Sequence, residues 1–149
     1  MLGFNVTSCP HMRGGVAPAE GHARRGWCVV GSVLTKSLDK PDESRPFSNG
    51  VSEMVSIEGT MIGRARFQPG WRWSNDVKPI AQTDRCMILH KGYCIAGSMT
   101  VQADDGTETT ISPGDGYVIE PGHDAWVIGG EACVLVDFSE QMMEYAKAP

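Results

Sequence analysis

The chain alternates apolar and polar residues over several short stretches, and a turn signal ends each of them. From Val51 to Ile57 every second residue shares one face, Glu58-Gly59 marks a turn, and a second alternating run covers residues 60–67. Alternation with period two predicts half-buried strands, and a tight turn between two such strands predicts an antiparallel hairpin. A second hairpin is expected within residues 99–111, where Asp104-Asp105-Gly106 separates two alternating runs.

Five further runs rich in apolar or β-branched residues predict strands over residues 33–37, 86–95, 117–119, 125–128 and 131–138. Residues 39–50 predict a polar connection, because they are rich in Pro, Asp, Ser and Asn. Ser139 is a suitable N-cap for a short helix at the C-terminal end. Many short strands separated by tight turns predict an all-β domain, a small antiparallel β-barrel.

The first 27 residues differ from the rest of the chain. They show neither a helical nor a strand period, and Gly, Pro, Ala and Arg dominate them. This composition predicts a flexible N-terminal extension, residues 1–27, followed by one ordered domain, residues 28–149. A length of 149 residues suits a single domain.

Charge and composition narrow the function classes. A net charge of -5 without a basic stripe argues against nucleic-acid binding. No apolar run approaches the ~20 residues of a membrane span, and the N-terminus lacks the basic and apolar regions of a signal peptide. Five cysteines without a Cys-x-x-Cys pair predict reduced, buried thiols in a cytoplasmic protein rather than a disulfide framework.

Residues 111–127 contain two tight turns around the short apolar run 117–119. Their spacing resembles the second motif of the cupin family, which reads Gly, five residues, Pro-x-Gly, two residues, His, three residues, Asn. The two glycines of that motif match Gly114 and Gly122. The proline, histidine and asparagine positions of the motif are occupied by Glu120, Ala125 and Gly129.

The first cupin motif resembles this sequence less closely. Counting back from Gly97 puts His90 at the motif's glutamate, and Asp84 and Cys86 at its His-x-His pair. The resemblance covers about residues 60–138 and implies a jelly-roll barrel with a pocket inside it. It also implies a homodimer, for which residues 33–37 offer an edge strand.

The resemblance leaves two interpretations of the pocket open. The family holds a divalent metal with three histidines and a glutamate, and none of these four stands unchanged here, which favours a metal-free pocket. His90 is then an interior histidine that acts as a general acid or base. Alternatively, a rearranged set binds Zn²⁺ or Fe²⁺. Period two places Asp84, Cys86 and His90 on one side of a strand, and His123 joins them from a turn.

The loop at residues 68–79 is the candidate for contacts with a small-molecule ligand. It carries Trp71, Trp73 and Lys78, which we expect to close over the pocket, with Lys78 pairing with an anionic ligand. The two tryptophans can equally serve as a simple cap. We therefore expect a small-molecule enzyme of isomerase, cyclase, lyase or oxygenase type acting around His90. A non-catalytic ligand-binding or regulatory cupin is the alternative, and a purely structural role is a third interpretation.

Overall fold

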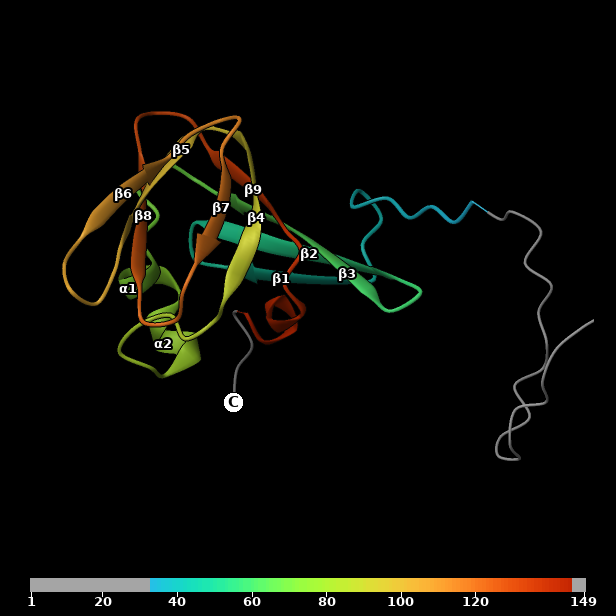
Figure 1. Cartoon of the computed structure of the whole chain (residues 1–149), viewed down its shortest axis with the longest axis horizontal. Helices are drawn as coiled ribbons and strands as arrows, with labels where there is room; N and C mark the ends of the chain where they lie inside the picture. The colour runs from blue at the N-terminus through green and yellow to red at the C-terminus, as the bar shows by residue number, and fades with distance from the viewer. Residues whose placement is uncertain (1–32, 146–149) are drawn as a thin grey trace, which may run out of the picture. The chain divides into compact units, whose positions relative to one another are not determined.

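The computed structural model describes residues 33–145, except for the side chains of Met143 and Glu144. Two antiparallel sheets form this region (Figure 1). The larger sheet has the strand order β1-β2-β3-β9-β4-β7, and the smaller one has the order β6-β5-β8. The strands of the two sheets are β1 Glu43–Phe47, β2 Gly50–Ile57, β3 Thr60–Phe67, β4 His90–Ala96, β5 Ser98–Gln102, β6 Glu108–Ile111, β7 Gly116–Ile119, β8 Asp124–Ile128 and β9 Cys133–Asp137.

This arrangement confirms the predicted all-β class, as two sheets of jelly-roll type rather than a closed barrel. The two hairpins also form as predicted. Strands β2 and β3 pair across the turn at Glu58-Gly59, and Ile57 lies opposite Thr60. Strands β5 and β6 pair with Gln102 opposite Glu108. The predicted extension, residues 1–27, lies outside the described residues.

The first strand was predicted in the wrong place. Residues 33–37 form no strand, and β1 lies instead inside the stretch that was predicted to be a polar connection. Its polar residues are compatible with a strand because β1 is the edge of the sheet, where a proline such as Pro46 is also tolerated. Arg45 also donates from Nη1 to the carbonyl oxygen of Tyr145 at 2.9 Å. The run that was expected to supply a dimer edge therefore supplies none.

Two other predictions needed correction. The strand expected from residue 86 begins only at His90, and residues 82–89 form a loop. The loop at residues 68–79 contains the short helix α1, Trp73–Asp76, and the start of α2, Lys78–Ala81. The predicted C-terminal helix is a single 3₁₀ segment, η1 Glu140–Glu144, and the hydroxyl of Ser139 caps it by accepting from the backbone nitrogen of Gln141.

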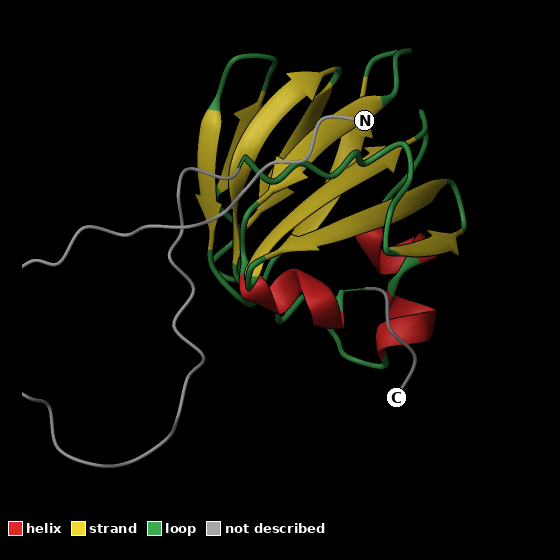
Figure 2. Ribbon diagram, turned by 90° about the vertical axis from the view of Figure 1, so that its right-hand side faces the viewer, coloured by secondary structure: helices red, strands yellow, loops and turns green. Residues whose placement is uncertain are grey.

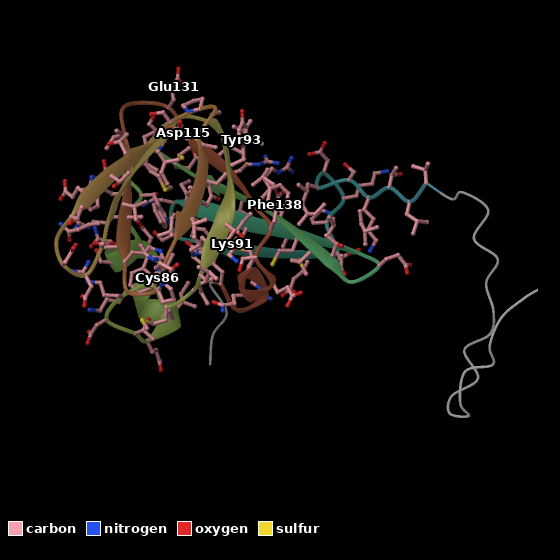
Figure 3. All side chains as sticks on the ribbon, viewed as in Figure 1. Cys86, Lys91, Tyr93, Asp115, Glu131 and Phe138 are labelled. Carbon is pink, nitrogen blue, oxygen red and sulfur yellow. The ribbon has the colours of Figure 1, made fainter. Side chains whose placement is uncertain are left out.

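The core fills the space between the two sheets, and the helical segments gather at one end of them (Figures 1 and 2). Inward residues include Phe67 on β3, Met99 on β5, Val127 on β8 and Leu135 on β9. Tyr93 of β4 points outward and is 47% exposed (Figure 3). In the described region no helix is long and apolar enough to cross a membrane.

Candidate metal centre

Three buried side chains with metal-ligating atoms meet at one end of the core: Cys86, His90 and His123. Their ligand atoms all lie within 4.8 Å of one another. They come from the loop before β4, the first residue of β4 and the turn before β8. An isolated bridge holds the loop and the turn together, because Cys86 N donates to His123 O at 2.9 Å and Gly122 N donates to Cys86 O at 2.7 Å. Backbone pairing thus fixes two of the three donors independently of any ligand.

Each histidine is oriented by a hydrogen bond at its Nδ1. His90 Nδ1 lies 2.7 Å from Asp137 Oδ2, and His123 Nδ1 lies 2.6 Å from the carbonyl oxygen of Glu120. Both partners are acceptors, so each Nδ1 carries the proton. In the neutral tautomer, Nε2 of both rings is then the unprotonated nitrogen. This is the arrangement in which a metal-binding histidine is held by a second group.

The protonation state of the cluster provides a thiolate at Cys86, and a metal would have to displace the Nε2 proton of His90. Burial alone would raise the pKa of Cys86, but hydrogen bonds with His123 and His90 outweigh it and lower that pKa to about 6. Burial alone would lower the pKa of His90, but Asp137 and Cys86 outweigh it and raise that pKa to about 9. Without a metal, the two groups therefore form a thiolate–imidazolium pair. The thiolate is the form that binds a metal.

The donor types suit a zinc ion, and the spacing of the Cys86–His90 pair fits one. Bond lengths of about 2.3 Å to sulfur and about 2.0–2.1 Å to nitrogen imply about 3.6 Å between the two donors in a tetrahedral site. The distance between Cys86 Sγ and His90 Nε2 is 3.6 Å. Three protein ligands leave a fourth position open, which is typical of catalytic rather than structural zinc.

A small cavity lies against the two histidines. Its volume is about 30 Å³, room for about two water molecules. The lining is mostly apolar and aromatic, and it comprises Ala65, Phe67, Trp71, Trp73, His90, Met99, Tyr117, Ile119, His123, Ala125, Leu135, Asp137, Met142 and Tyr145. Strands of both sheets, the α1 region and η1 all contribute to it. The cavity therefore lies between the two sheets, next to the two histidines.

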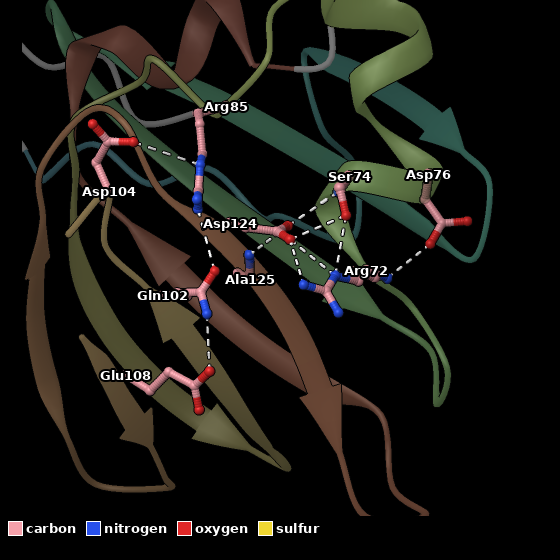
Figure 4. A network of polar contacts seen from close by, with 9 residues as sticks. All are labelled: Arg72, Ser74, Asp76, Arg85, Gln102, Asp104, Glu108, Asp124 and Ala125. Carbon is pink, nitrogen blue, oxygen red and sulfur yellow. Dashed lines mark hydrogen bonds and ion pairs between the residues drawn. The ribbon is translucent and has the colours of Figure 1, made fainter. Parts of the chain in front are cut away.

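A polar network ties the tryptophan-bearing segment to β8 (Figure 4). Arg72 donates from Nε to the buried carboxylate of Asp124 at 2.9 Å, and Arg72 Nη2 forms an ion pair with the same carboxylate at 2.8 Å. The carboxylate also accepts from the backbone nitrogen and the hydroxyl of Ser74. Arg72 stacks over the ring of Trp126, which does not line the cavity. Arg72 and Ser74 lie on either side of Trp73 in sequence, so the network holds that segment against the sheet.

The comparisons with known proteins concern the fold. No model of a protein family matches the sequence. No curated protein matches it either. Among solved structures, an RmlC-like cupin from Shewanella frigidimarina is similar at 13% identity and a TM-score of 0.50, over 73% of this chain and 94% of its own. Ectoine synthase from P. lautus is similar at 14% identity and a TM-score of 0.52, over 71% of this chain and 78% of its own.

The chain has the fold of the cupin superfamily. A protein of unknown function from Rhizobium leguminosarum is similar to the same extent, at 16% identity and a TM-score of 0.52, over 71% of this chain and 94% of its own. Identities this low support the shared fold and leave the activity to be argued from the site itself.

The residues at the predicted motif positions differ in whether they reach the donor cluster. Ala125, at the position of the family histidine, is buried and lines the cavity. His123, two residues earlier, supplies the imidazole from the turn instead. Cys86 and His90, at two positions of the first motif, both reach the centre.

Two of the predicted site residues lie elsewhere. Asp84 is at the surface, where its carboxylate pairs with Lys78 Nζ at 3.1 Å, and neither side chain lines the inner cavity. Period two does not extend to Asp84, because residues 82–89 form a loop rather than a continuous strand. Trp71 and Trp73 do line the cavity, and each is only 2% exposed, so they form its wall rather than an exposed rim.

The sequence analysis missed Asp137, the carboxylate that orients His90. A signal was present, because period two along β9 puts Asp137 on the same inward face as Cys133 and Leu135. A carboxylate on a buried face needs a partner, and here the partners are His90 and the backbone nitrogen of Ser139. Tyr145, which packs edge-on against His90 at 5.4 Å between centroids, was also missed.

Proposed function

We propose that this protein is a small-molecule enzyme of the cupin type that works in the inner cavity and holds a divalent metal with Cys86, His90 and His123. One observation carries the proposal: three buried donors converge within 4.8 Å, and both imidazoles are fixed through Nδ1 so that Nε2 is available.

The donor set selects among metals. One thiolate and two imidazoles suit Zn²⁺ better than Mg²⁺ or Mn²⁺, which prefer oxygen ligands. Asp137 is engaged with His90 and Ser139, which argues against the two-histidine, one-carboxylate set typical of Fe²⁺ oxygenases. Zinc has no redox chemistry, so an isomerase, cyclase or lyase reaction is favoured over an oxygenase reaction.

The residues of the chain provide the surroundings of the reaction. A zinc ion held by Cys86, His90 and His123 would supply Lewis acidity at the edge of the cavity. Asp137 keeps His90 oriented, and the carbonyl of Glu120 does the same for His123. Phe67, Trp71 and the other apolar residues of the lining exclude bulk water, which strengthens every polar contact inside the cavity. The similarity in fold to a protein named ectoine synthase supports a small-molecule role.

Metal analysis of the full-length protein tests the proposal. We expect about one zinc per chain after purification without added chelator. His90→Ala and Cys86→Ser should abolish this stoichiometry, and His123→Ala should at least weaken it. Cys133→Ser is the matched control, because Cys133 is equally buried but lies outside the donor cluster. Metal that is retained in all three ligand variants, or absent from the native protein, would refute the proposed centre.

Cobalt substitution separates a catalytic centre from a structural one. Co²⁺ bound through Cys86 should show a thiolate charge-transfer band that Cys86→Ser removes and Cys133→Ser keeps. If the fourth position is open, added azide should change the visible spectrum. A spectrum that azide leaves unchanged would favour the alternative, a ligand-binding cupin without chemistry at the metal.

A further inference from the structure

The outer face of the larger sheet has two unlike halves. On β2 and β3 it is charged and paired, because Glu53 Oε2 lies 2.8 Å from Arg64 Nε and 3.1 Å from Arg66 Nη2. The segment before β1 lies against this half, since Arg64 Nη2 donates to Leu38 O at 2.8 Å and pairs with Asp39 at 2.9 Å. The β2–β3 half is therefore already satisfied within the chain.

The other half, on β7, β4 and β9, is apolar. Tyr93 and Ile95 point outward from β4, Val118 points outward from β7, and Phe138 directly follows β9; the four are 47–63% exposed. Val136 of β9 lies opposite Tyr93 and joins them into one surface. The outer face of an antiparallel sheet in water usually carries polar residues. These five residues, here called the apolar face, depart from that rule.

A contiguous apolar surface of this kind marks an interaction site, whereas single exposed apolar residues do not. Charges stand at both ends of the apolar face (Figure 3). Lys91 is the second residue of β4. At the other end of β4, Asp115 O accepts from Cys94 N at 2.9 Å, and Glu131 comes directly before the residue that touches Gly97. Within the described part of the chain, neither Lys91 nor Glu131 forms an ion pair.

This distribution of charge makes the surface complementary to itself. A twofold axis that lies between two copies and crosses the strands near Tyr93 stacks β4 on β4 of the other copy, running in the opposite direction. The apolar halves then meet, and the Lys91 end of each copy faces the Asp115 and Glu131 end of the other. An apolar centre with charged residues around it is the usual anatomy of a protein interface. A uniformly acidic or basic partner would instead meet like charge at one end.

We infer that the chain forms a homodimer through the apolar face, with Tyr93 near the twofold axis and Lys91 of one protomer opposite Asp115 and Glu131 of its partner. This surface differs from residues 33–37, which were expected to supply a dimer edge. None of the five residues of the apolar face lines the inner cavity. The dimer is therefore independent of the proposed metal centre, and Cys86→Ser should leave it intact.

Sedimentation of the full-length protein tests the inference. We expect twice the chain mass of 16.1 kDa. Ile95→Lys should raise the dissociation constant of the dimer at least about 30-fold, because it places an unpaired charge in the apolar centre. Ile128→Lys is the matched control, since Ile128 is an exposed isoleucine on β8 of the smaller sheet, and it should leave the dimer unchanged. Circular dichroism checks that both variants fold.

A charge exchange tests the orientation of the two copies. Lys91→Glu and Glu131→Lys should each weaken the dimer several-fold, since each sets like charges against each other. The double variant should recover part of the lost affinity, because it restores opposite charges across the interface. Losses that simply add in the double variant would overturn the proposed arrangement.

Spectra of the native protein avoid the question of whether a variant folds. In a mixture of isotope-labelled and unlabelled chains, isotope-filtered spectra should show contacts between protomers from Tyr93 and Phe138. Contacts from the smaller sheet instead, or an unchanged dimer in Ile95→Lys, would overturn the inference. So would a native protein that remains monomeric at the concentrations of these spectra, including one in which residues 1–32 contact Tyr93 of the same chain.

Discussion

Replacing Asp137 by asparagine should disable the metal centre by reversing the tautomer of His90. Asp137 is 2% exposed, and its Oδ2 lies 2.7 Å from His90 Nδ1. In Asp137→Asn, the amide oxygen can still accept from Ser139 N, as Oδ1 does now at 2.7 Å. The amide nitrogen then faces His90, and Nδ1 must accept instead of donate. Nε2 consequently carries the proton and loses the lone pair that binds a metal.

The size of the effect follows from this loss of orientation. Removing the partner of a metal-binding histidine typically costs about 10–100-fold in metal affinity. This corresponds to about 1.4–2.7 kcal/mol of binding free energy. The fold should persist, because the asparagine matches aspartate in size and keeps the hydrogen bond to Ser139.

The assay is competition with a chromophoric chelator for Zn²⁺, together with thermal unfolding of the metal-free proteins. Asp76→Asn is the matched control, since Asp76 is also a buried, hydrogen-bonded carboxylate, and its partners are Asn49 and the backbone nitrogen of Arg72. It should reduce stability and leave the zinc affinity unchanged. A folded Asp137→Asn protein that binds zinc as tightly as the native protein would refute the role assigned to Asp137.

Three further predictions concern the pH response, the turn after β4 and the cavity wall. In the metal-free protein, the thiolate absorbance of Cys86, identified by its loss in Cys86→Ser, should titrate near pH 6. The stability that this thiolate contributes should therefore be lost as the pH falls through that value. His90→Gln should raise the midpoint of the titration, and an unchanged midpoint would contradict the pairing of Cys86 with His90. Gly97→Ala should lower stability by about 2–3 kcal/mol in denaturant unfolding, because φ is +62° and the new methyl group would meet Ala132 O. Met142→Ala should cost about 2–5 kcal/mol, since Met142 is 1% exposed, and a smaller loss would show that η1 is not packed as described.

Local patterns were enough to predict most of the strands. In the hairpins at residues 50–67 and 98–111, alternation and a turn with a glycine at positive φ agree with each other. Such segments carry their pairing partner nearby in sequence, so little depends on the rest of the fold. The strand at Glu43–Phe47 was not predicted from its local pattern. Its charged residues suit the edge of a sheet, and the sequence pattern does not show which strand lies at the edge.

For the candidate site, too, local patterns predicted some of the residues and only the tertiary structure revealed the others. The sequence alone determined that His90 faces inward on a strand and that the tryptophans belong to a segment near the pocket. It also singled out His123, although parity through a turn is unreliable. Only the tertiary structure decided that Asp84 is at the surface and that Asp137 orients His90, which lies 47 residues earlier in the chain.

The physical reason is the range of the interactions involved. Alternation and turn propensity act over a few residues, so the sequence by itself determined the all-β class, the hairpins and the inward face of β4. The cluster of Cys86, His90 and His123 depends on β4 pairing with β9 and on the bridge between Cys86 and His123. Those contacts join distant segments, and they exist only once the two sheets have packed around a common core.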